Sequence, residues 1–204
     1  MNNYDEAKEI YIKHGGSYFF MDRGDVPLFQ KYKSFNVPKE LEKQWDEEMF
    51  NNYMEEIENE KNMDKLWILF SAFVGISTKM HRVSGLSYVM DKLLTSDYDT
   101  FTNLKGVEII FKDIKYFAYY EKDKTVEIAK KALDFLKDLQ DKDITVSKDY
   151  YPNKESREGA FFSDEKIKKR IEDGIKEYTA KYEEIKNKTP EELFPEFMRK
   201  MFIK

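Results

Sequence analysis

The sequence contains no cysteine among its 204 residues. Disulfide bonds, thiolate catalysis and cysteine-based zinc or iron–sulfur sites are therefore excluded. Glycine and proline are scarce, with 8 and 5 residues, which is too few turn formers for a sandwich of many short strands. The longest uncharged apolar run, at 66–78, is well short of the ~20 residues that cross a bilayer, so we expect a buried helix there. No secretory signal is visible at the N-terminus, and we expect a cytoplasmic protein without membrane contact.

Charged and aromatic side chains, in contrast, are abundant. Charged residues make up 37% of the chain, and aromatic residues make up 16%. A hydrophobic share of 41% supplies a core, while the charged residues suit long helices that each keep one face in solvent. The sequence therefore predicts a mostly α-helical fold, either an irregular multi-helix bundle or a short stack of helical hairpins. Because lysine greatly outnumbers arginine, the composition is also typical of an AT-rich bacterial genome.

Apolar residues recur at helical spacing along most of the chain. We expect a single helical domain over 1–204, with core helices at 37–141 and C-terminal helices at 163–204. Residues 1–36 are expected to form an N-terminal helix and a small appendage. The helical period is lost at 142–162, which predicts an irregular loop.

The least helical stretch is 17–35, where two apolar segments flank a turn-like tetrapeptide at 22–25. Gly24 suits a positive φ, and Pro27 is tolerated on an edge strand, so this stretch predicts a small β-hairpin near 17–33. The tetrapeptide includes the tripeptide Arg-Gly-Asp. Motifs of this length often occur by chance, and we interpret it as a turn.

Several local signals predict where helices begin and end. The glycine pair that starts at Gly15 should end the first helix, and Ser96 is a candidate cap for the helix that follows it. Gly75 and Gly85 lie inside the apolar segment and predict a break or a close approach of two helices. The sequence Thr-Pro-Glu-Glu at 189–192 is a capping box with proline at the first helical position.

Motifs for catalysis, metals and cofactors are absent from the sequence. The two histidines, His14 and His81, have no histidine or acidic residue four positions away, so neither forms a helical metal-binding pair. No GxSxG, GxGxxG or phosphate-binding GxxxxGK[ST] pattern is present, and no aspartate pair opens an EF-hand loop. We therefore predict no catalytic residue, no metal ligand and no cofactor.

Negative charge is concentrated in one predicted helix at 39–60. Nine acidic residues and two lysines give this helix a net charge of −7, larger in magnitude than the −5 of the whole chain. One interpretation is a solvated helix face, and the other is a patch that attracts a basic partner. Our binding candidates on this face are Glu47, Glu48, Glu55 and Glu56.

Aromatic residues cluster at 116–120, where they occupy four of five positions. On a helix such a run points in all directions, so some of these rings must leave the core. Tyrosine suits an interface because it packs an apolar ring and keeps a polar tip. A protein interface and a helix sandwiched between neighbours remain equally favoured.

Two classes of function remain open. The favoured one is a non-enzymatic bacterial protein-interaction module: an adaptor, a regulator or an immunity-type protein that neutralises a basic toxin through the acidic helix. The alternative is a small-ligand-binding protein or an enzyme with a pocket around His81, Arg82 and Tyr88. The acidic net charge argues against a nucleic-acid partner. A narrow apolar seam at 167–185 would allow a homodimer.

Overall fold

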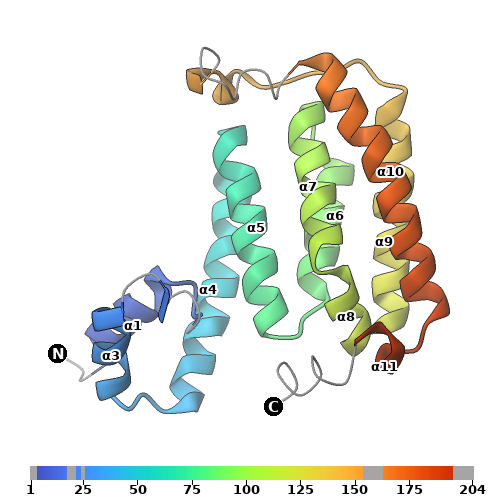
Figure 1. Ribbon diagram of the computed structural model, residues 1–204. Helices are drawn as coiled ribbons and strands as arrows, with labels where there is room; N and C mark the ends of the chain where they lie inside the picture. Colours follow the sequence, from blue (N-terminus) through green and yellow to red (C-terminus); the bar gives the residue numbers. More distant parts are fainter. Residues whose placement is uncertain (1–3, 18–21, 24–25, 154–162, 195–204) are drawn as a thin grey trace. The chain divides into compact units, whose positions relative to one another are not determined.

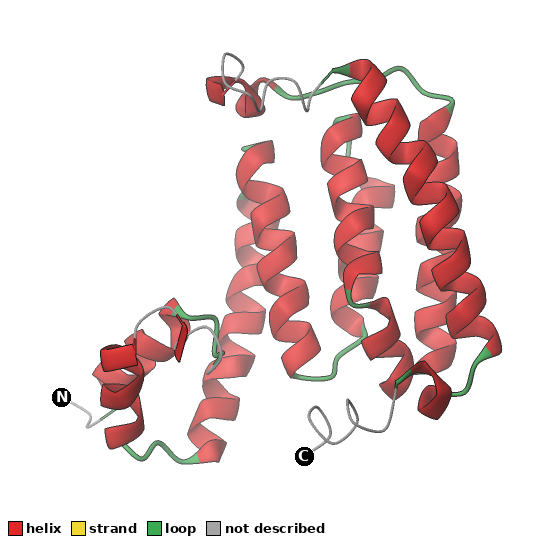
Figure 2. Ribbon diagram, viewed as in Figure 1, coloured by secondary structure: helices red, strands yellow, loops and turns green. Residues whose placement is uncertain are grey.

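The computed structural model describes residues 4–17, 22–23, 26–153 and 163–194 (Figure 1). Within these ranges every regular element is a helix and none is a strand, which confirms the predicted α-helical fold (Figure 2). The chain groups into two compact units, 1–59 and 60–204. The appendage expected at 1–36 is thus smaller than the first unit, which also includes the acidic helix.

The first unit contains three described helices with defined bounds, which are α1 (Asp5–Lys13), α3 (Val26–Ser34) and α4 (Lys39–Asn59). Gly15 and Gly16 follow α1 with φ angles of 58° and 66°. Glycine adopts this left-handed conformation without a steric penalty, so the pair ends α1 as predicted. The buried side of α4 carries Trp45, Met49 and Ile57, four or eight positions apart, as its apolar period predicts.

The prediction of a β-hairpin near 17–33 is wrong for the segment that was expected to form its second strand. That segment forms α3, in which Pro27 occupies the second position. Proline fits there because an N–H in the first turn of a helix has no intrahelical partner. Phe29 and Tyr32 are buried three positions apart, which is a helical and not a strand spacing. Residues 18–21 and 24–25 of the predicted hairpin lie outside the described residues.

The second unit is a helical bundle around α7. Its elements are α5 (Met63–Lys79), α6 (Ser84–Thr95), α7 (Thr100–Lys112), α8 (Ile114–Tyr120), α9 (Lys122–Gln140), a 3-10 helix (Lys148–Asn153), α10 (Asp164–Asn187) and α11 (Pro190–Leu193). α7 packs against α5, α6 and α9, and α10 lies along α9 (Figure 1). Of the helices in the described ranges, none is long and apolar enough to cross a membrane. The apolar run at 66–78 instead supplies α5 with core residues, including Phe70 and Phe73.

The break predicted in the apolar segment lies between α5 and α6. Gly85 is the point of close approach, since a Cβ added there would lie 2.0 Å from Ser77 Oγ. Gly75, in contrast, would bring a Cβ into open space. Ser96 does not cap α7 as expected. It ends α6, and Asp99 caps α7 by accepting hydrogen bonds from the first backbone N–H groups.

The apolar seam at 167–185 packs within the chain. Ile167, Ile171 and Ile185 are fully buried on α10, the helix that lies along α9. The seam side chains are therefore already in contact with their own unit, and a homodimer through them stays a prediction. At the end of α10 the capping box is confirmed, because Thr189 and Glu192 exchange both expected hydrogen bonds.

Candidate functional site

The N-terminal half of α4 uses two of its carboxylates inside the first unit. Tyr11 donates a hydrogen bond to Asp46 Oδ1 at 2.9 Å, and Asp46 is only 7% exposed. Tyr32 donates a similar bond to Glu42 Oε1 at 2.6 Å. These bonds attach α1 and α3 to α4, so part of the helix's negative charge serves the packing of the unit.

Aromatic rings form the core around these bonds. The Tyr11 ring lies 5.7 Å from the Tyr32 ring and 5.4 Å from the Trp45 ring, centroid to centroid. Burial, followed by the charge and the hydrogen bond of Asp46, raises the pKa of Tyr11 far above its usual value. The Tyr11 hydroxyl is therefore a permanent donor near neutral pH. Sequence reasoning missed this arrangement because Tyr11 and Asp46 are far apart in the chain.

The four acidic candidates on α4 fall into two groups. Glu48 is exposed and forms a salt bridge with Lys8 at 2.6 Å, and Glu47 is half-buried. Glu55 and Glu56 are both exposed. Neither of these two carboxylates has a hydrogen-bonding or ion-pairing partner in the part of the chain that the structure describes.

Glu55 and Glu56 lie near the C-terminal end of α4, where the helix dipole is negative. The last turn of the helix contains no basic residue. A negative charge near this end is unfavourable by about 0.3–1 kcal/mol. The charge of Glu56 also acts locally, since burial and this neighbour together raise the pKa of Tyr53. The two glutamates thus add negative potential without contributing to the packing of the unit.

His81 lies in the turn between α5 and α6, in a left-handed conformation with φ of 58°. The N–H of Arg82 donates to the carbonyl oxygen of Ser77 at 2.9 Å, which closes the end of α5. Helices that end in this way usually place glycine where His81 stands. A β-carbon there costs roughly 1–2 kcal/mol, so the side chain must compensate through its contacts.

The His81 ring packs against two tyrosines of α8. Its centroid lies 4.1 Å from that of Tyr120 in a stacked arrangement, and Nδ1 lies 2.6 Å from the Tyr116 hydroxyl. Partial burial lowers the pKa of His81, and burial raises that of Tyr116. The neutral ring and the Tyr116 hydroxyl therefore share a hydrogen bond, whose donor is set by the tautomer of the ring. This contact fixes α8 to the turn that precedes α6.

The alternative pocket around His81, Arg82 and Tyr88 stays a prediction. Tyr88 is half-buried and packs edge-on against Phe73 at 5.3 Å, with the Lys92 ammonium 5.6 Å from its ring centroid. These partners differ from those of the His81 ring. These ring contacts of His81 and Tyr88 thus involve different residues.

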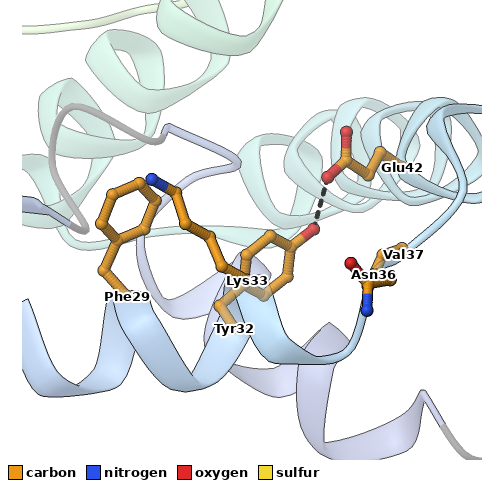
Figure 3. Close-up of a pocket in the computed structure, with 6 residues that line it drawn as sticks. All are labelled: Phe29, Tyr32, Lys33, Asn36, Val37 and Glu42. Carbon is orange, nitrogen blue, oxygen red and sulfur yellow. Dashed lines mark hydrogen bonds between the residues drawn. The ribbon is translucent and has the colours of Figure 1, made fainter.

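A groove of about 400 Å³ opens between α3 and the start of α4 (Figure 3). Sequence reasoning missed it because the α3 segment was interpreted as a strand. The signal was present, since positions 29, 32 and 33 have the spacing of one helical face. The residues that line the groove are Phe29, Tyr32, Lys33, Asn36, Val37 and Glu42.

The chain matches no family model, no curated protein and no solved structure. The function is therefore inferred from the geometry and charge of the described residues. Within these residues, no group of three or more histidine, aspartate and glutamate side chains is placed to hold a metal ion.

Proposed function

We propose that this chain is a non-enzymatic protein-interaction module that binds a basic partner through the C-terminal acidic patch of α4, formed by Glu55 and Glu56. The observation that carries the proposal is that both carboxylates are exposed near the negative end of a helix and pair with no cation among the described residues. A lysine or arginine side chain of a partner would offset both the mutual repulsion and the unfavourable dipole interaction.

The charge distribution of the chain also supports a positively charged partner. Residues 1–59 include thirteen acidic and seven basic side chains, a net charge of −6, whereas the rest of the chain has a net charge of +1. A concentrated negative potential attracts a cationic protein over a distance of about one Debye length, roughly 8 Å at physiological salt. It also increases the association rate more than the affinity.

Two carboxylates of α4 already take part in the packing of the first unit. Asp46 and Glu42 already accept hydrogen bonds from buried tyrosines. Glu55 and Glu56 are available, since no described side chain bonds to them. An adaptor, a regulator and an immunity-type protein would all use such a patch, because each requires a cationic surface on the partner.

The proposal is tested by neutralising the patch in the double variant E55Q/E56Q. A ten-residue lysine-rich peptide serves as the basic probe, and isothermal titration calorimetry measures its affinity. Loss of two exposed charge pairs should weaken binding by roughly two- to thirtyfold at low salt. The matched control is E172Q/E183Q, which removes the same charge from exposed positions of α10. Equal weakening by both variants would contradict a specific patch.

A further inference from the structure

The groove on the first unit combines aromatic rings with charged groups. Phe29, Tyr32 and Lys33 come from α3, and Glu42 comes from the first turn of α4. In Figure 3 the Lys33 side chain extends over the Phe29 ring, and the Tyr32 hydroxyl points to Glu42. A groove of about 400 Å³ is large enough for a small organic group or one long side chain.

The rings of the groove are held in place from behind. Tyr32 is 3% exposed, and its ring stacks on Tyr11 at 5.7 Å with an angle of 24° between the planes. Its hydroxyl is fixed by Glu42 at 2.6 Å. Phe29 is 9% exposed, so most of its surface is packed and only a small part is open to solvent. Such preorganisation reduces the ordering cost of binding.

A cation already lies over the Phe29 ring. Lys33 Nζ lies 4.2 Å from the ring centroid, within the ~6 Å range of a cation–π contact. Lys33 is exposed, and no carboxylate among the described residues pairs with it. An exposed contact of this kind favours the bound position by only roughly two- to fivefold. A ligand cation can therefore displace the lysine at little cost.

The charge around the groove favours a cationic ligand. Glu42 lines it directly, and the first unit has a net charge of −6. An anionic ligand could pair with Lys33 but would be repelled by the rest of the unit. Aromatic faces beside a carboxylate are a common recognition site for ammonium groups.

We infer that this groove binds an alkylammonium or guanidinium group, which takes the place of the Lys33 ammonium on the Phe29 ring. The inference rests on the proposed function, since both require a cationic partner, and it adds a second contact on α4. Glu42 and Glu55 are thirteen residues apart, or roughly 20 Å along the helix. The group can belong to a side chain of a basic protein or to a free organic amine.

The test is a titration of the full chain with n-butylammonium, followed through the amide chemical shifts of 29–42. K33M should tighten binding by roughly fivefold, because it removes both the competing ammonium and its repulsion of the ligand. The control K13M removes an exposed lysine of α1 and should bind like the wild type. Butyrate, the anion of similar shape, should not bind. The Lys33 side chain is outside the core, so K33M should fold normally.

Two results would overturn the cation site. One is a K33M affinity for n-butylammonium that is equal to or weaker than the wild-type affinity. The other is butyrate binding to the wild type that K33M removes. The variant E55Q/E56Q should bind n-butylammonium like the wild type. A failed groove test therefore does not change what the lysine-rich peptide shows about the acidic patch of α4.

The source of the cation is distinguished by a second probe. N-acetyl-lysine N-methylamide places the same ammonium on a blocked peptide unit. Tighter binding of this probe than of n-butylammonium would assign the groove to a side chain of a basic protein. Tighter binding of n-butylammonium would assign it to a free amine.

Discussion

At the scale of single residues, His81 has a left-handed backbone conformation that is unusual for a residue with a β-carbon. It adopts φ of 58° at the end of α5, yet its ring stacks on Tyr120 and forms a hydrogen bond with Tyr116. Backbone strain at a non-glycine residue persists only when surrounding contacts compensate for it. Here the compensation comes from α8, which the sequence alone could not place beside this turn.

Two substitutions separate the strain at His81 from its ring contacts. His81→Ala and His81→Gly both remove the ring, but only glycine also removes the cost of the β-carbon. We expect the glycine variant to be more stable than the alanine variant by about 1 kcal/mol. Urea denaturation of the two variants measures this difference. Equal stabilities, or a more stable alanine variant, would contradict the strained-turn account.

Protonation of His81 should make stability depend on pH. Partial burial lowers the pKa of the folded state below the ordinary value of about 6.5. The unfolded chain therefore binds the proton first as the pH falls, and the folded state loses stability between about pH 6.5 and its own lower pKa. Above this window the contribution is fully present.

The pH effect is measured by comparing the wild type with His81→Gln. Urea denaturation at pH 7.5 and pH 5.5 should show a smaller loss of stability on acidification in the variant. The other titrating groups act equally in both proteins, so the difference reports His81 alone. An identical pH dependence would show that His81 does not titrate in this way.

At the scale of the elements, α4 has two halves with different roles. Glu42 and Asp46 bind buried tyrosines, whereas Glu55 and Glu56 are exposed near its negative end. The sequence predicted the helix, its length and its charge from the apolar period and the composition. It could not separate the two halves, because the tyrosines that bind the first half come from other helices.

Neutralising the acidic patch should stabilise the protein. Glu55 and Glu56 lie close to the C-terminal end of α4, where a negative charge is unfavourable. E55Q/E56Q should therefore raise the free energy of unfolding by about 0.3–1 kcal/mol per charge at low salt. Thermal and urea denaturation at low and high salt check this. A loss of stability would mean that the carboxylates serve the fold and not a partner.

Replacing each of two glycines in the apolar segment by alanine should change the free energy of unfolding in opposite directions. Gly85 faces Ser77, where an added Cβ would lie 2.0 Å from Oγ, so Gly85→Ala should cost about 1–3 kcal/mol. Gly75 lies inside α5 with no atom within 4 Å of such a Cβ. Gly75→Ala should therefore gain about 0.5–1 kcal/mol from the better helix former. Urea denaturation of both variants gives the comparison, and the same sign at both positions would refute the close approach.

The sequence was a better guide to helices than to the place of each side chain. The capping box that starts at Thr189 and the turn after α1 were predicted because their residues act on neighbouring backbone. The α3 segment was missed because Gly24 and Pro27 resemble a hairpin turn and an edge strand. The groove was missed for the same reason, since its walls come from α3 and the start of α4, which lie side by side only in the folded unit.

At the scale of the whole molecule, the two units differ in charge. The first has a net charge of −6 and the second has a net charge of +1. The proposed binding function belongs to the first unit, where both the acidic patch and the groove lie. Attraction of this kind weakens with salt, because exposed charges more than about 10 Å apart are screened at 0.1 M.

The most direct measurement of the proposed function is an NMR titration of the wild-type chain with the lysine-rich peptide. Amide shift changes should include the last ten residues of α4, beside any at the groove residues 29–42, and decrease when the salt concentration is raised from 50 to about 300 mM. The exposed acidic positions of α10, such as Glu172, should change little. Shift changes spread evenly over both helices, or absent from the end of α4, would contradict the proposed patch.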